Sequence, residues 1–395
     1  MKFFKSLPAR LLLAIATGIL AGLVLPRGAM VVVVTAKYIL GQIIMFCVPL
    51  IIIGFIAPSI CKLGGSATRM LTVAVILAYA SSVLAAFMSM FAGYAIIPHL
   101  NIITDPEGLR ELPAVAFQLD IPQIMPVMSA LVFSMLLGLA VVWTRSRVTS
   151  SILLEFQNIV LEIVKRIIIP ILPFFIATTF CGLAWEGSIT HQLPIFLVVI
   201  LIVMVGHFIW LAVLYGSASV YSGRSGREVI SHYGPAYLTA VGTMSSAATL
   251  GVALECARKS KNLRPDLVDF GIPLFANIHL CGSVLTEVFF VMTISKVLYG
   301  KLPTLSSMIL FCLLLGVFAI GAPGVPGGTV MASLGLITGV LGFDSDGTAL
   351  MLAIFALQDS FGTACNVTGD GALTLFLTGY AEKHGIKEAP QESVL

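Results

Sequence analysis

The stretch LSSMILFCLLLGVFAIGAPGVPGGTVMASLGLITGVLG, residues 305–342, has no charged residue and is interrupted at its centre by GAPGVPGG, residues 321–328. Glycine and proline at this density end a helix. Each apolar half is shorter than the roughly 20 residues that a membrane span requires. We therefore predict two half-helices that enter and leave the membrane on the same side, a re-entrant hairpin over about 304–342.

A second hairpin is predicted over about 228–258, where GTMSSAAT (242–249) lies between two basic flanks. Basic loops stay cytoplasmic, so both ends of this segment belong on one side. A span over about 266–297 follows this hairpin, and a span over about 346–381 follows the other. The order hairpin–span–hairpin–span, with the second pair inverted, is typical of secondary transporters.

The composition agrees with a polytopic membrane protein. Of 395 residues, 58% are hydrophobic and only 10% charged, and the mean hydropathy is +1.04. A soluble protein carries about 25% charged residues, so a soluble enzyme is excluded. The net charge of +3 is too small to indicate nucleic-acid binding. The seven cysteines lack CxxC spacing and indicate neither a disulfide framework nor a zinc site.

Six apolar runs precede the first hairpin, and basic residues lie in alternate connectors. The runs are 9–26, 29–58, 70–98, 121–143, 152–184 and 193–220. The first could pass for a signal peptide, but no A-x-A pattern follows it, so we interpret it as a span. We expect an all-α protein of the cell (inner) membrane with eight transmembrane helices, two re-entrant hairpins and both termini cytoplasmic.

Four polar residues of the last span share one helical stripe: Asp359, Thr363, Asn366 and Asp370 are spaced i, i+4, i+7, i+11. A carboxylate at the bilayer centre costs at least about 2.5–3.5 kcal/mol. Two of them require partners, so the stripe predicts binding of an ammonium, a metal cation or both. The alternative is two structural carboxylates buried by neighbouring helices.

The tips of the two hairpins are the next candidates. Ser245, Ser246 and Thr249 place hydroxyls and free N–H groups at a helix start that would attract a carboxylate, although the same residues suit close packing. The tip 324–329 lets backbone approach a ligand and could hinge as a lid; a rigid kink is the alternative.

The seventh span carries isolated polar residues in an apolar context. His279 and Cys281 lie two residues apart and would point to different faces of a regular helix, so we expect no metal site there. Glu287 is a candidate proton relay, or else the acceptor of an interhelical hydrogen bond.

With these motifs, the chain resembles the dicarboxylate/amino acid:cation symporter family, the glutamate-transporter fold. The resemblance covers nearly the whole chain in layout. It is specific in four strings: TMSSAATL (243–250), PLFANIHLCGS (273–283), GAPGVPGGTVM (321–331) and DSFGTACNVTGD (359–370). It implies a homotrimer in which residues 1–220 are mainly scaffold, with the third span packed on the core. Residues 221–395 would form a transport core that slides across the membrane, with the second hairpin as gate.

The resemblance also implies residue roles. Asp359 would hold the substrate's ammonium, and Asn366 with the backbone around Ser246 its α-carboxylate. Asp370 and carbonyls near Asn366 and Asn277 would bind coupling cations, with a sodium ion expected at Asp370 and Asn366. The remaining implied pocket residues are Ser245, Ser283, Val325, Thr329, Gly362 and Thr363.

Two departures from the family pattern change the expected chemistry. Gly362 stands where members with acidic substrates have an arginine that would pair with the side-chain carboxylate, so a neutral substrate is favoured. The family's NMDGT is HLCGS here, which removes an aspartate of one sodium site and places His279 in it. This histidine invites proton coupling; a neutral, hydrogen-bonded histidine is the alternative. The string DGTAL (346–350) mimics the missing motif by coincidence.

We therefore expect a sodium- or proton-coupled symporter of a small neutral amino acid, without a cofactor and not an enzyme. Alternatives are a dicarboxylate or acidic amino acid symporter, proton- rather than sodium-coupled, and, from a different class, an ion channel along the polar stripe. An intramembrane aspartyl protease is excluded, because Asp359 and Asp370 are about 16 Å apart along one helix.

Overall fold

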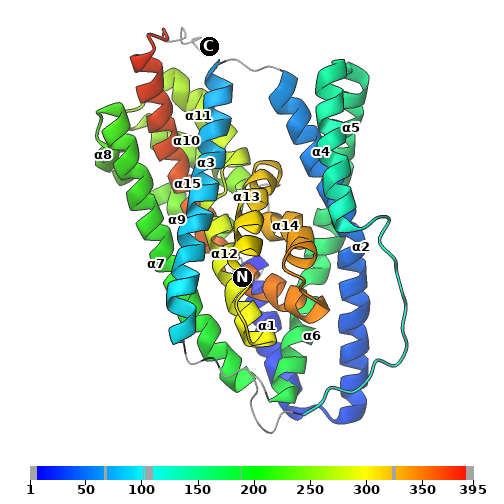
Figure 1. Cartoon of the computed structure of the whole chain (residues 1–395). Helices are drawn as coiled ribbons and strands as arrows, with labels where there is room; N and C mark the ends of the chain where they lie inside the picture. Colours follow the sequence, from blue (N-terminus) through cyan, green and yellow to red (C-terminus); the bar gives the residue numbers. More distant parts are fainter. Residues whose placement is uncertain are drawn as a thin grey trace.

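The computed structural model describes residues 7–65, 69–100, 102, 110–187, 189–322 and 326–387, and within these residues it contains helices and no strand (Figure 1). The N-terminal half comprises α1 (Leu7–Val24), α2 (Arg27–Gly65), α3 (Arg69–Ile96), η2 (Ile97–His99), α4 (Val127–Thr144), α5 (Arg147–Ile163), η3 (Val164–Ile168), α6 (Ile169–Glu186) and α7 (Ile189–Ser222). The α5–η3–α6 run is continuous and lies beside the long α2. Each of the six predicted apolar runs overlaps these helices, although the fourth, predicted from residue 121, is helical only from Val127.

The C-terminal half comprises α8 (Gly226–Ser231), α9 (Gly234–Thr243), α10 (Ser246–Arg258), α11 (Pro265–Ile278), α12 (Cys281–Tyr299), α13 (Leu305–Gly321), α14 (Gly328–Gly339) and α15 (Ser345–Lys383). Helix α9 packs on α10, and α13 packs on α14. The breaks between the members of each pair fall at the two predicted tips. Whether each pair re-enters the membrane stays a prediction.

The predicted seventh span is not one regular helix. It is divided into α11 and α12, because His279 is extended (φ −115°, ψ 105°) and Leu280 also leaves the helical region. The expectation of an unbroken helix over 266–297 is therefore wrong, and with it the argument that His279 and Cys281 must point to different faces. The small residues Cys281-Gly282-Ser283 begin the new helix.

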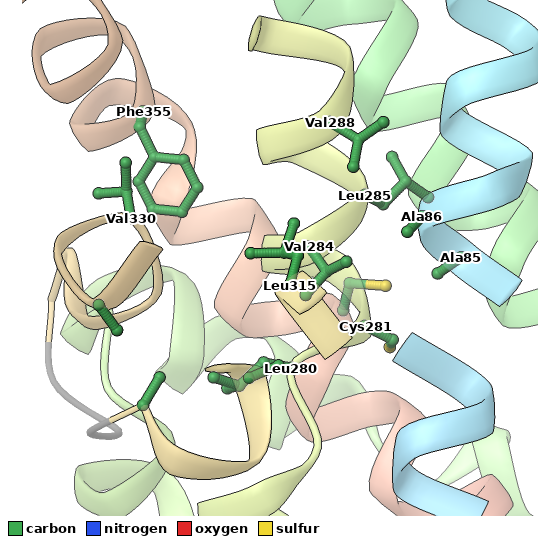
Figure 2. Packing of buried hydrophobic residues seen from close by; sticks show 14 of the residues in the cluster. Ala85, Ala86, Leu280, Cys281, Val284, Leu285, Val288, Leu315, Val330 and Phe355 are labelled. Atoms are coloured by element: carbon green, nitrogen blue, oxygen red, sulfur yellow. The ribbon is translucent and has the colours of Figure 1, made fainter. Parts of the chain in front are cut away.

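Helices α12 and α15 form the buried centre of the molecule. Nearly every residue of both is buried, polar ones included, because α3, α7, α11 and the two hairpin pairs surround them. Figure 2 shows one side of this packing: Ala85 and Ala86 of α3 face Leu285 of α12, and Val330 of α14 lies beside Phe355 of α15. Small residues on α3 let the two helices approach closely.

The outer helices expose large apolar side chains. Examples are Leu20, Phe91, Trp143, Phe174 and Phe208, each more than half exposed. Within the described residues, six helices are long and apolar enough to cross a membrane, and four further apolar helices are shorter. An apolar exterior around a core that contains buried polar residues is the arrangement of a multi-pass membrane protein.

The contact between α1 and α6 generates a test of the packing. Gly18 and Gly22 form a GxxxG spacing whose Cα atoms face Ala177 and Cys181 of α6; a Cβ on Gly18 would lie 3.1 Å from the Ala177 Cα. Gly18→Val forces the two helices apart, and we expect the free energy of unfolding to fall by about 1–3 kcal/mol. The measurement is the melting temperature of the purified protein.

Gly28→Val is the matched control, because a Cβ at Gly28 has no heavy atom within 4 Å apart from its chain neighbours and its own helix. Equal melting temperatures for the two variants would contradict the close α1–α6 contact.

Candidate substrate and cation site

The polar stripe predicted for the last span lies on one unbroken helix, α15. Asp359, Thr363, Asn366 and Asp370 are each at most 4% exposed. The helix carries no Lys or Arg before Lys383 in its last turn. Any cationic side chain that pairs with these two carboxylates must therefore come from another element.

Asn366 joins the stripe to the broken seventh span. Its Oδ1 accepts hydrogen bonds from the N–H groups of Gly282 (2.7 Å) and Ser283 (3.2 Å), which are unpaired donors at the start of α12. Its Nδ2 donates to the Ser283 hydroxyl at 2.9 Å. Asn366 and Ser283 are thus brought together as expected, but the asparagine side chain acts first as a cap on α12 and has one amide hydrogen left for a ligand.

Asp359 meets the tip of the second hairpin. Its Oδ2 accepts a hydrogen bond of 2.6 Å from the N–H of Gly327, directly before α14. Gly327 has a φ of +71°, which glycine adopts without strain. Thr329, the second residue of α14, is buried. The predicted pocket residue Val325 lies outside the described residues.

Gly362 lies against the start of α12. A Cβ added there would be 3.4 Å from the N, Cα and Oγ atoms of Ser283, which is ordinary van der Waals contact. A Cβ can therefore be placed at Gly362 without displacing the backbone of α12. Gly362 and Ser283, both predicted as pocket residues, are neighbours.

The first tip is built as a helix cap. The hydroxyl of Ser245 accepts from the N–H of Ala248 at 3.2 Å, and Ser246 begins α10 as a buried residue. Helix α10 packs on α15, so the tip belongs to the same core.

His279 and Asp370 form a buried pair. The imidazole Nδ1 is 2.9 Å from Asp370 Oδ1, and Nε2 is 2.8 Å from the hydroxyl of Ser81 on α3. Both partners are at most 1% exposed. Because His279 stands in the extended break between α11 and α12, its ring reaches sideways to α15. Asp370 Oδ2 has no hydrogen-bond partner among the described residues and is the atom that a cation could approach.

Asn277 lies away from the polar stripe of α15, whereas Cys281 lies against this helix. Asn277 is exposed and donates to the carbonyl of Pro273 in its own helix at 2.8 Å, so its side chain is not brought to Asn366 or Asp370. Cys281 and His279 both border Gly369, since a Cβ there would lie 3.4 Å from the thiol and 2.9 Å from the imidazole. No cluster of three or more potential metal ligands is found in the described ranges.

The chain matches the sodium:dicarboxylate symporter family over residues 7–379. It belongs to this family. The four strings that carried the resemblance all lie within the matched residues.

The family relatives are named as transporters. The chain is 24% identical over 291 residues to glt-4 of Caenorhabditis elegans, by name a sodium-dependent excitatory amino acid transporter, with 72% of this chain and 57% of that protein covered. It is 27% identical over 229 residues to excitatory amino acid transporter 2 of Mus musculus, covering 56% and 39%. Human excitatory amino acid transporter 3 is 31% identical over 163 residues, covering 40% and 29%. The chain thus spans about half or less of the relatives it matches.

Several residues that contact the site were not identified from the sequence. Ser81 bonds His279, and His207 of α7 approaches the carbonyl of Gly282 at 3.0 Å and the hydroxyl of Thr286 at 2.9 Å. The sequence feature that could have identified Ser81 and His207 is that each is a polar residue inside an apolar span. Glu287, for which two roles were open, accepts a hydrogen bond from Ser333 of α14.

The hydrogen bond between Ser81 and His279 can be tested by comparing substitutions of Ser81 and of the adjacent Ser82. Ser81→Ala leaves a buried imidazole nitrogen without its partner, which costs about 1–3 kcal/mol. We expect a lower melting temperature of the purified protein. Ser82→Ala is the matched control, because the Ser82 hydroxyl is buried without a partner in the described structure, so its removal should not destabilise the protein. A larger loss for Ser82→Ala would contradict the assignment.

Proposed function

We propose that this family member is a cation-coupled symporter of a small neutral amino acid. The observation that carries the proposal is the site around Asp359: a buried carboxylate on α15, next to the backbone of the second tip, with Gly362 one turn away. An amino acid presents a cation and an anion close together, and this site offers a complementary group for each.

Asp359 is the group for the ammonium. No cationic side chain lies on α15 before Lys383, and in the described structure the Asp359 carboxylate accepts a hydrogen bond from the N–H of Gly327. An ammonium would be a stronger partner than one amide, because both partners are then charged. Binding would therefore compete for the atom that now holds the tip, which connects substrate binding to the position of α14.

The α-carboxylate has two donors available. The second amide hydrogen of Asn366 Nδ2 remains free after the bond to Ser283, and the start of α10 at Ser246 presents a helix N-terminus. Neither donor is cationic. The substrate's side chain would extend along Gly362, which offers no cationic group to pair with a second carboxylate. A neutral amino acid therefore fits better than a dicarboxylate or an acidic one.

The coupling ion is sodium, a proton, or both. Asp370 Oδ2 and the carbonyls near Asn366 favour sodium; the contact between Asp370 Oδ1 and His279 favours a proton, since the imidazole takes one of the two carboxylate oxygens. The elevator movement, the homotrimer and the cytoplasmic position of both termini are part of the same proposal and rest on the family. An ion channel along the stripe is the alternative from another class.

The deciding experiment is uptake into proteoliposomes that contain the purified chain. A panel of neutral and acidic amino acids and dicarboxylates is offered under separately imposed sodium and proton gradients. Saturable uptake of a neutral amino acid driven by either gradient, with substrate-driven counterflow, supports the proposal. Non-saturating current without counterflow would indicate a channel, and preference for dicarboxylates would refute the neutral substrate.

Asp359→Asn should abolish amino acid uptake while the protein remains folded. The amide oxygen can still accept the hydrogen bond from Gly327, but it has no charge for the ammonium, and losing a buried charge pair costs 2 kcal/mol or more, roughly 30-fold in affinity. Uptake and the melting temperature are measured together. Asp269→Asn, which changes an exposed carboxylate of α11, is the control. Unchanged uptake by Asp359→Asn would remove the ammonium role.

Gly362→Arg should shift the preference toward acidic substrates. A Cβ fits beside Ser283, and a guanidinium at this position could form two parallel hydrogen bonds with a side-chain carboxylate. The ratio of aspartate to alanine uptake should rise at least tenfold, as expected for about 1.4 kcal/mol. Gly362→Gln, which adds a polar but uncharged and shorter side chain, is the control. An equal rise in both variants would assign the effect to size.

A further inference from the structure

A cavity of about 270 Å³ lies between the two halves of the chain, away from the polar stripe. Its wall is contributed by α2 and α6 of the first half and by the first turns of α15 of the second half. Most of the lining is apolar and includes Ile44, Val115, Phe175 and Leu352. The volume is slightly below the roughly 300–1,000 Å³ of typical small-molecule sites, so it suits one compact apolar body.

Two charged side chains of opposite sign line the cavity. Among the described residues that line it, only Lys37 of α2 and Asp346 of α15 are charged, and they form an ion pair with Nζ and Oδ1 2.9 Å apart. Tyr38 also lines the cavity, and its hydroxyl donates to Asp120 at 2.7 Å, so this nearby acid is already engaged. A ligand with a charged end would therefore meet the Lys37–Asp346 pair.

The two members of the pair are not equally dependent on each other. The Asp346 side chain is 64% exposed, whereas that of Lys37 is only 17% exposed. Asp346 also lies in the first turn of α15, where a negative charge is favoured by the helix dipole. It can turn to water at little cost, because exposed ion pairs contribute little. The Lys37 side chain has less freedom, because most of its length is covered by the neighbouring helices and its ammonium gains from an anionic partner there.

The geometry points to a binding site for an anionic amphiphile, such as a medium-chain carboxylate, in this cavity. The anionic end replaces Asp346 on the Lys37 ammonium, and the hydrocarbon fills the space between Phe175, Val115 and Leu352. A cationic amphiphile is disfavoured, because it would bind the exposed Asp346 and leave the Lys37 ammonium without its anionic partner. The site is separate from Asp359 and Asp370.

Occupation of the cavity also has a consequence for movement. The ligand would contact α2 and α6 on one side and α15 on the other, so it holds together two groups of helices. If the proposed function is correct and α15 moves relative to α2, the amphiphile slows transport without competing with the substrate. This second part rests on the proposed function, whereas binding itself does not.

Binding is tested on the purified full chain in lipid nanodiscs, with radiolabelled decanoate as the probe and empty nanodiscs as background. Decan-1-ol and decylammonium serve as competitors with the same hydrocarbon and a different end. Decanoate should bind saturably, and neither competitor should displace it at equal concentration. Equal displacement by all three would show mere partition into apolar surface and overturn the proposal.

Two substitutions give opposite expectations. Lys37→Met keeps the apolar stem and removes the ammonium, and should weaken decanoate binding at least tenfold. Asp346→Asn removes the competing anion and should strengthen it about threefold or more. A purely structural role of the ion pair would weaken binding in both variants. An unchanged affinity in Lys37→Met, or a weaker one in Asp346→Asn, would refute the site.

Lys165→Met is the matched control, because Lys165 is also paired with an acid, Glu162 at 3.6 Å, but lies away from the cavity. Its affinity for decanoate should equal that of the unmodified chain. In proteoliposomes, decanoate should lower the maximal uptake rate at constant KM, and Lys37→Met should remove this effect. Binding without inhibition would leave the site standing and contradict only the movement; absent uptake would concern the proposed function alone.

Discussion

The hydrogen bonds between the Asn366 side chain and the start of α12 are the constraint on which the centre of this molecule depends. A helix that begins inside a membrane exposes N–H groups that water cannot reach, and each must find an internal acceptor. Asn366 Oδ1 accepts from two of them, at Gly282 and Ser283. The same residue lies between Thr363 and Asp370 on the stripe, so satisfying the backbone of α12 also fixes where the stripe faces.

The break that Asn366 stabilises is what gives His279 its position. In an unbroken helix, the imidazole would lie on the helix surface at a place set by the 3.6-residue repeat. Extended backbone at His279 instead directs the ring toward Asp370 and Ser81, on two different helices. The contact of His279 with Asp370 is therefore a consequence of backbone irregularity, which is tolerated here because it is enclosed by protein.

Much of the fold could be predicted from hydropathy and breaks, because length and polarity decide where a helix can lie in a membrane. The tip at 321–328 and the stripe on α15 follow from local composition and from a repeat of 3.6 residues. The division of the seventh span could not be predicted in the same way. HLCGS contains no proline and only one glycine, and the break is stabilised by Asn366, about eighty residues further along the chain.

The same limit applies to Ser81 and to the orientation of Asn277. Which hydroxyl meets His279 depends on how α3 packs on α12, and packing between helices is not encoded in either helix alone. Asn277 has a suitable residue type, but its side chain returns to Pro273 of its own helix. Residue type and spacing therefore identify the stripe, whereas the residues that complete it depend on tertiary contacts.

Polar contacts also distinguish the helices of the first half from one another. Helix α3 is joined to the second half by several hydrogen bonds: Ser81 to His279, Ser89 to the carbonyl of Leu285, and Tyr94 to that of Pro303. Helix α7 adds bonds from Tyr215 to the carbonyl of Thr368 and from His207 to α12. In contrast, α1 packs against α6 through glycines.

Buried hydrogen bonds in an apolar environment are costly to break, whereas apolar surfaces can slide. If the second half moves, α3 and α7 must move with it, and the boundary of movement then lies along α2 and α6, where the Lys37–Asp346 pair crosses it.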